Sequence, residues 1–91
     1  MSVPVFDLAA IKAAATPGLV LDSVRDALIA HAEGRTSVPP PLHLDFPDAD
    51  GDCHVKAGWI TGAADFTVKI ATGFYANPAI GLPSNHGLVC V

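Results

Sequence analysis

The chain has 91 residues, of which 51% are hydrophobic and 15% are charged, and its formal net charge is −4. This length allows a single domain. The five basic residues are dispersed, so the basic footprint that nucleic-acid binding requires is missing. No apolar run reaches the roughly 20 residues of a membrane-spanning helix, and the N-terminus lacks the pattern of a secretory signal. We therefore expect a cytoplasmic protein that binds neither nucleic acid nor membranes.

The apolar fraction is high for a domain of this size, because small domains have proportionally more surface to cover. Two explanations are favoured over an ordinary compact monomer. Either the domain buries an apolar face against a partner, or it is part of a larger chain. The two cysteines, Cys53 and Cys90, are expected to be free thiols, because disulfides are rare in proteins that are not secreted.

The first third of the chain predicts two helices. Asp7 can cap a helix over residues 8–15, and this segment is rich in alanine. Thr16 followed by Pro17 is typical of the start of a second helix. Apolar residues recur at helical spacing over 17–33, and Gly34 is placed to end that helix.

After Gly34 the hydrophobic pattern changes from a helical period to alternation. The three prolines at 39–41 make a stiff, extended segment that cannot be helical. Three alternating segments follow, separated by turns rich in Asp and Gly: residues 42–46, 53–60 and 66–72. They predict a three-stranded antiparallel meander. The expected fold class is therefore α+β, with two N-terminal helices packed on a mainly antiparallel β-sheet.

The last part of the chain predicts a loop and the beginning of another strand. Residues 73–87 are rich in Gly, Pro and Asn, and loops of that length in small domains are usually functional. Residues 88–91 are apolar and β-prone, with no turn, cap or polar tail after them. We therefore expect the natural chain to continue beyond Val91.

Lys69 is the residue with the clearest chemical potential. It stands in the middle of a predicted strand, on the face that also carries Thr67 and Ala71. If it lines a cavity, its ammonium group can bind a substrate carboxylate and assist proton transfer. The alternative is a solvated lysine on the open face of an antiparallel sheet.

Lys56 shares a strand face with His54. If the two neighbouring strands pair around the turn at 61–65, opposed residue numbers sum to roughly 126, which places Lys56 near Ile70 to within a residue or two. Lys56 and Lys69 are therefore expected to lie close together. Two ammonium groups repel each other unless an anionic ligand lies between them. An anion site and a pair of solvated lysines remain the two alternatives.

The sequence predicts no metal site and no cofactor site. His43, His54 and His86 are scattered, and no two of them have the spacing of metal ligands within a helix. Cys53 and His54 do not form a nucleophile pair, because neighbouring strand residues point to opposite faces. No Gly-x-Gly-x-x-Gly motif occurs, so the recognisable turn of a dinucleotide-binding fold is missing.

A long, ordered motif then connects these residues. Members of the ornithine cyclodeaminase/mu-crystallin family have a lysine-bearing strand followed by a loop of the form G-x-x-x-N-P-x-x-G-L-P-S-x-x-G. The stretch 51–91 resembles that family through Lys69, Gly73, Asn77-Pro78, Gly81-Leu82-Pro83-Ser84 and Gly87. The two predicted helices and the segment from Gly34 to the prolines also fall where the family has them. The resemblance therefore covers nearly the whole chain.

The resemblance implies that residues 1–91 are a partial substrate-binding and dimerisation domain, and that a Rossmann domain binding NAD or NADP is absent. Such enzymes oxidise the Cα–N bond of a small amino acid, or reduce the matching imino acid, by hydride transfer. Lys69 would be catalytic and would contact the substrate carboxylate, and Asn77 and Ser84 would bind substrate. A homodimer is implied. The chain alone is then expected to hold no cofactor and to be inactive.

One position departs from the family pattern. Many members have an arginine that binds the substrate carboxylate, within a motif P-x-R-x-x-L, and Pro41 stands at that position here. Proline cannot bind an anion through its side chain, so we hypothesise that Lys56 binds substrate and takes over part of this role. The substrate therefore need not be ornithine. The alternative function is a small, dimeric, non-enzymatic binding module derived from the same fold.

Overall fold

The computed structural model describes all 91 residues and divides the chain into two compact units, Met1–Gly34 and Arg35–Val91. The first unit contains two helices and the second a five-stranded, antiparallel sheet. The predicted α+β class is thereby confirmed. Each unit is described by itself below.

The helical unit forms where local capping chemistry predicts it. Helix α1 spans Leu8–Ala14, and the carboxylate of Asp7 accepts a hydrogen bond from the Ala10 backbone N–H at 2.9 Å. Helix α2 spans Pro17–Ala32, and the Thr16 hydroxyl accepts from the Leu19 N–H at 3.3 Å. Gly34 follows with φ of 73°, a left-handed conformation that glycine adopts without steric penalty. Neither helix is long and apolar enough to cross a membrane.

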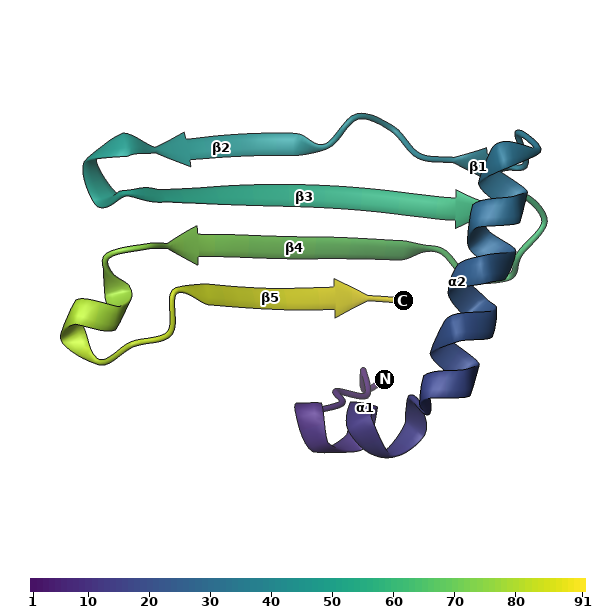
Figure 1. Ribbon diagram of the computed structural model, residues 1–91, viewed down its shortest axis with the longest axis horizontal. Helices are drawn as coiled ribbons and strands as arrows, with labels where there is room; N and C mark the ends of the chain where they lie inside the picture. Colours follow the sequence, from purple (N-terminus) through teal and green to yellow (C-terminus); the bar gives the residue numbers. More distant parts are fainter. The chain divides into compact units, whose positions relative to one another are not determined.

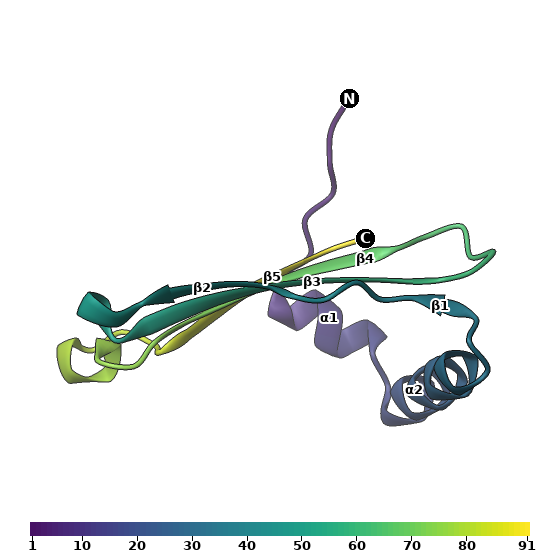
Figure 2. The same ribbon diagram turned by 90° about the horizontal axis from the view of Figure 1, so that it is seen from above.

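The sheet unit is one layer of antiparallel strands (Figures 1 and 2). Strand β3 is the longest, and β4 and β5 follow it in order on one side. On its other side, β1 pairs with one end of β3 and β2 with the opposite end. The strands are β1 (Thr36–Ser37), β2 (Leu42–Phe46), β3 (Gly51–Ile60), β4 (Thr67–Phe74) and β5 (Asn85–Cys90).

The predicted loop over residues 73–87 was too long. Strand β4 continues to Phe74, because Gly73 and Phe74 pair with the first residues of β3. Strand β5 begins at Asn85, which pairs with Gly73. Between them a 3-10 turn, η2, occupies Asn77–Ile80. Neighbouring strands thus impose extended structure on residues whose own β-propensity is low.

The predicted turn over 47–52 was also too long. A 3-10 turn, η1, spans Pro47–Ala49, and Asp50 follows in the left-handed region with φ of 48°. Aspartate tolerates this conformation better than most residues. Strand β3 therefore begins at Gly51, and its second residue, Asp52, is already paired with Asp45 of β2.

Strand alternation and register separate the sheet into two chemically different faces. The apolar face, which also contains Thr72 and His86, carries Leu42, Leu44, Phe46, Cys53, Val55, Ala57, Trp59, Val68, Ile70, Phe74, Leu88 and Cys90. The polar face, which also contains Ile60 and Val89, carries His43, Asp45, Asp52, His54, Lys56, Thr67, Lys69 and Asn85. Both cysteines are free thiols, as predicted.

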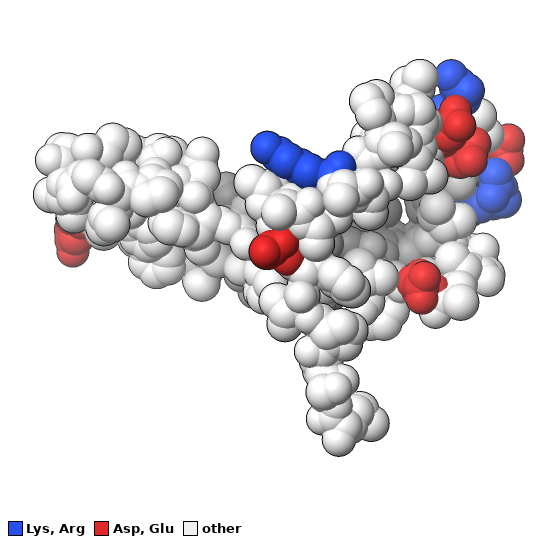
Figure 3. Space-filling model, turned by 90° about the horizontal axis from the view of Figure 1, so that it is seen from below, with Lys and Arg blue, Asp and Glu red and all other residues white.

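Hydrophobic side chains remain largely exposed in this chain. Ala30, at 2% exposure, is the buried hydrophobic residue of the chain, whereas Leu44 and Leu88 of the apolar face are about half exposed. The side of the molecule drawn in Figure 3 is mostly uncharged, with its charged side chains in small separate groups and no continuous basic patch. This scatter agrees with the dispersed basic residues of the sequence.

Candidate functional site

The two predicted lysines lie directly opposite each other on neighbouring antiparallel strands. The register pairs Lys56 of β3 with Lys69 of β4, so opposed residue numbers sum to 125 rather than the predicted 126. Directly opposed side chains share a face and have Cβ atoms roughly 5 Å apart. Both lysines are exposed, and neither forms an ion pair. The polar face therefore holds two uncompensated ammonium groups side by side, which is an arrangement that an anionic ligand would stabilise.

Pro41 lies near this pair. It directly precedes Leu42, the first residue of β2, and Leu42 pairs with Val55, the neighbour of Lys56 on β3.

A second group of polar side chains occupies the same face, nearer to the η1 turn. His43 of β2 is paired with His54 of β3, and their rings are stacked with centroids 4.3 Å apart and planes 11° apart. Asp52 lies two residues before His54 on the same strand and therefore on the same face. These three side chains each place one possible ligand atom within 4.8 Å of the others.

Residue spacing within helices does not reveal this group, because its members lie on two strands. The signal that finds it is the pairing of two alternating segments around the turn at 47–50, which brings His43 opposite His54. The i, i+2 relation of Asp52 and His54 in a strand then adds the carboxylate.

Tyr75 fixes the Asp52 carboxylate. Its hydroxyl donates to both carboxylate oxygens, at 3.2 and 3.1 Å. This hydrogen bond and the negative charge of Asp52 raise the pKa of Tyr75 above its ordinary value of 10.0, with smaller contributions from burial and from Asp50. The direction is expected because ionising the phenol would break the bond and place two negative charges together.

The change Asp52→Asn is therefore expected to lower the pKa of Tyr75 toward its ordinary value. The chain has one tyrosine, so the ultraviolet absorbance of tyrosinate during an alkaline titration reports this group alone. Asp45→Asn is the matched control, since Asp45 faces Asp52 across the strands but does not contact the phenol. An unchanged titration in Asp52→Asn would show that the Tyr75–Asp52 bond does not form.

The predicted substrate-binding residues Asn77 and Ser84 lie away from the lysines. The Asn77 side-chain amide donates to the Pro83 carbonyl at 3.1 Å, which closes the segment after β4. The Ser84 carbonyl accepts from the Phe74 N–H at 2.8 Å. Lys69 pairs with Val89, five residues from Ser84, so Ser84 lies about 16 Å along the strands from Lys69, at about 3.3 Å per residue. The structure thus brings Lys56 and Lys69 together, and places Asn77 and Ser84 at the Asp52 end of the sheet.

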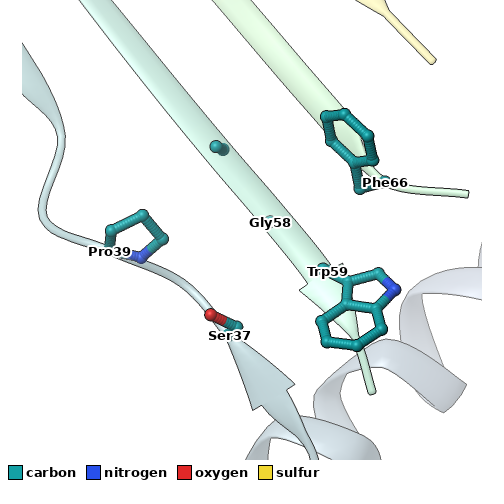
Figure 4. Close-up of a pocket in the computed structure, with 6 residues that line it drawn as sticks. Ser37, Pro39, Gly58, Trp59 and Phe66 are labelled. Atoms are coloured by element: carbon teal, nitrogen blue, oxygen red, sulfur yellow. The ribbon is translucent and has the colours of Figure 1, made fainter. Parts of the chain in front are cut away.

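A shallow hollow of about 310 Å³ lies at the opposite end of β3 (Figure 4). The indole of Trp59 forms part of its wall and donates a hydrogen bond from Nε1 to the Ala63 carbonyl at 3.0 Å. The other lining residues are mainly apolar: Ser37, Pro39, Ala57, Gly58 and Phe66. None of the predicted site residues lines this hollow, so it is not the candidate site.

Comparison with known proteins gives two informative relatives. The chain is 42% identical over 66 residues to a protein of Rhizobium meliloti that carries the name of a dehydrogenase, covering 72% of this chain and 20% of the relative. It is 44% identical over 75 residues to an uncharacterized cyclodeaminase of Sinorhizobium fredii, covering 78% of this chain and 23% of the relative. The chain thus spans about a fifth of the length of these relatives.

No family model matches the chain, and no solved structure matches it. The two relatives are consistent with an ornithine cyclodeaminase-like family, which is the family that the lysine-and-loop motif resembles.

Proposed function

We propose that this chain is the substrate-binding part of an NAD(P)-dependent amino or imino acid oxidoreductase, or of a cyclodeaminase of the ornithine cyclodeaminase-like family. Its substrate would be a small amino or imino acid whose carboxylate binds Lys56 and Lys69. The observation that carries this proposal is the direct opposition of the two unpaired lysines on the polar face. The names of the two relatives support the enzyme class.

The register supports a specific role for Lys56. In many members of the family that the sequence resembles, an arginine stands at the position of Pro41 and binds the carboxylate. Pro41 directly precedes Leu42, which pairs with the neighbour of Lys56, so the Lys56 ammonium can occupy the region that such an arginine would reach. Lysine presents a point charge rather than a planar fork, so it would hold a carboxylate with less geometric selectivity.

The residues of this chain do not themselves fit a nicotinamide nucleotide. Dinucleotides bind at the carboxyl ends of parallel strands, beside a glycine-rich turn and a helix N-terminus. Every strand pair here is antiparallel, and the glycine fingerprint is missing from the sequence. We therefore assign NAD or NADP to another part of the proposed enzyme and expect the 91-residue chain alone not to turn over NAD(P)H.

A homodimer belongs to the same proposal. The apolar face of the sheet supplies its support, because an antiparallel sheet commonly packs one face and leaves the other in water. The polar face, with its lysines, would then remain open to substrate.

The test is the change Lys56→Met in the full-length enzyme. Methionine keeps an unbranched, flexible side chain and removes the charge, so the KM for the amino or imino acid is expected to rise by about tenfold, the effect of losing roughly 1.5 kcal/mol from a hydrogen bond to a charged group. Steady-state kinetics measure this. Lys12→Met in α1 is the control, since Lys12 has no role in the proposed site. An unchanged KM for Lys56→Met would remove Lys56 from the site.

A further inference from the structure

We propose that His43, Asp52 and His54 bind a divalent transition metal ion such as zinc on the polar face of the sheet. The two histidines occupy paired positions on β2 and β3, and the aspartate lies two residues before His54 on β3, so all three side chains share a face. One ligand atom from each side chain lies within 4.8 Å of the other two. This site is independent of the lysine pair and of the proposed enzymatic function.

The donor types match this class of ion. Two imidazole nitrogens and one carboxylate oxygen are a set that zinc accepts, leaving a fourth position for water or another ligand. The same donors also suit other first-row divalent ions, among which geometry and availability decide. Calcium and magnesium prefer all-oxygen sites, so they are poor candidates for this group.

The geometry needs only a small closure. Zinc binds nitrogen and oxygen at about 2.0–2.2 Å, so tetrahedral ligand atoms lie roughly 3.4 Å apart. The two imidazoles are now stacked, and each must rotate so that a ring nitrogen points at a common centre. Rotation about the χ2 bond of histidine is broad and inexpensive. The strand pairing of β2 with β3 meanwhile keeps the two Cβ atoms close.

A supporting hydrogen bond is already present. The Tyr75 hydroxyl donates to both oxygens of Asp52 and so fixes the orientation of the carboxylate. Ligating carboxylates in metal sites are commonly held by such outer hydrogen bonds. Each carboxylate oxygen has two lone pairs, so one remains available for an ion while the other accepts from Tyr75.

The local charge favours a cation. Asp45 faces Asp52 across the strands, and Asp48 and Asp50 lie in and directly after the η1 turn. The nearest cationic group is the single ammonium of Lys56, two residues beyond His54, so negative charge predominates around the three ligands. The polar face is thus acidic at the Asp52 end and basic at the lysine end, and the histidines lie between the two.

The experiment is a titration of the untagged 91-residue chain with zinc, followed by calorimetry. We expect one ion per chain. His43→Ala, His54→Ala and Asp52→Asn should each weaken zinc binding by at least about tenfold. Loss of a residue that only hydrogen-bonds to a metal ligand already lowers metal affinity by about that much, and loss of a ligand should cost no less. His86→Ala is the matched control, because His86 pairs with Thr72 and lies on the apolar face of the same sheet.

A second readout identifies the ligands directly. Cobalt(II) in place of zinc should give the absorption of a nitrogen- and oxygen-ligated ion. A thiolate charge-transfer band would instead show that Cys53 or Cys90 holds the ion, and would overturn the proposal. The proposal would also be overturned if the chain bound no zinc, or if His86→Ala weakened zinc binding as much as the three ligand substitutions do. If His43→Ala does not fold, as judged by circular dichroism, His43→Gln tests the same ligand at similar size.

Discussion

Replacing Lys69 by methionine in the full-length enzyme is expected to lower kcat/KM for the amino or imino acid by about a hundredfold or more, the contribution of a positioned group that assists proton transfer. The loss should appear in kcat as well as KM, because Lys69 is proposed both to hold the carboxylate and to assist the imine chemistry. Lys56→Met should act mainly on KM. Steady-state kinetics of the two single variants separate these roles.

The two lysine substitutions should change activity without changing the stability of the fold. Lys56 and Lys69 face each other without a counter-charge, so removing either ammonium relieves a repulsion and should not destabilise the fold. Both side chains are exposed, and no cavity is created by the change to methionine. A loss of activity with unchanged thermal unfolding therefore reports on the site. If Lys69→Met retained the kcat/KM of the unmodified enzyme, Lys69 would not be catalytic.

The helices could be predicted from the sequence because their ends depend on neighbouring residues. Asp7 and Thr16 each accept a backbone hydrogen bond from the residue three positions later, and Gly34 adopts the left-handed conformation that ends α2. All of this chemistry lies within a few residues of chain. The alternation of side chains within each strand was predictable for the same reason, since it is local.

The register was not predictable to the residue, because it depends on how the turn between β3 and β4 closes. At the start of this turn the Thr61 N–H donates to the Arg35 carbonyl at 2.9 Å, a contact between distant parts of the sequence. If the register between two strands shifts by one residue, each side chain lies opposite a different partner, and the residues that had shared one face of the sheet no longer do so. With a sum of 125, Lys56 faces Lys69 directly rather than Ile70. The candidate anion site depends on this single step.

The extent of the strands and the His–Asp group were missed for a related reason. Gly73 and Asn85 have low β-propensity and predict loop, yet they pair with each other inside the sheet. His43 and His54 are eleven positions apart and become neighbours only through the pairing of β2 with β3. Such features follow from pairing partners, which the local pattern does not specify.

Gly51→Ala is expected to destabilise the chain by about 1–3 kcal/mol, the range for forcing extra volume into a closely packed position. A Cβ atom at Gly51 would lie 2.7 Å from Cε1 of Phe74 and 2.9 Å from the Gly73 carbonyl oxygen. The ring can shift, but it is stacked on Phe46 with centroids 5.9 Å apart, and the carbonyl belongs to the paired strand. The loss should appear as a lower midpoint in urea-induced unfolding.

Gly58→Ala is the matched control on the same strand. A Cβ there would meet only the Val38 methyl group at 4.0 Å, an ordinary contact, and alanine removes the entropic disadvantage of glycine in a strand. This variant should be as stable as the unmodified chain or slightly more stable. If Gly51→Ala were equally harmless, Gly51 could not lie between Phe46 and Phe74 as the register places it. That outcome would also remove the basis for setting Lys56 opposite Lys69, because the same pairing of β3 with β4 places both Gly51 and Lys56.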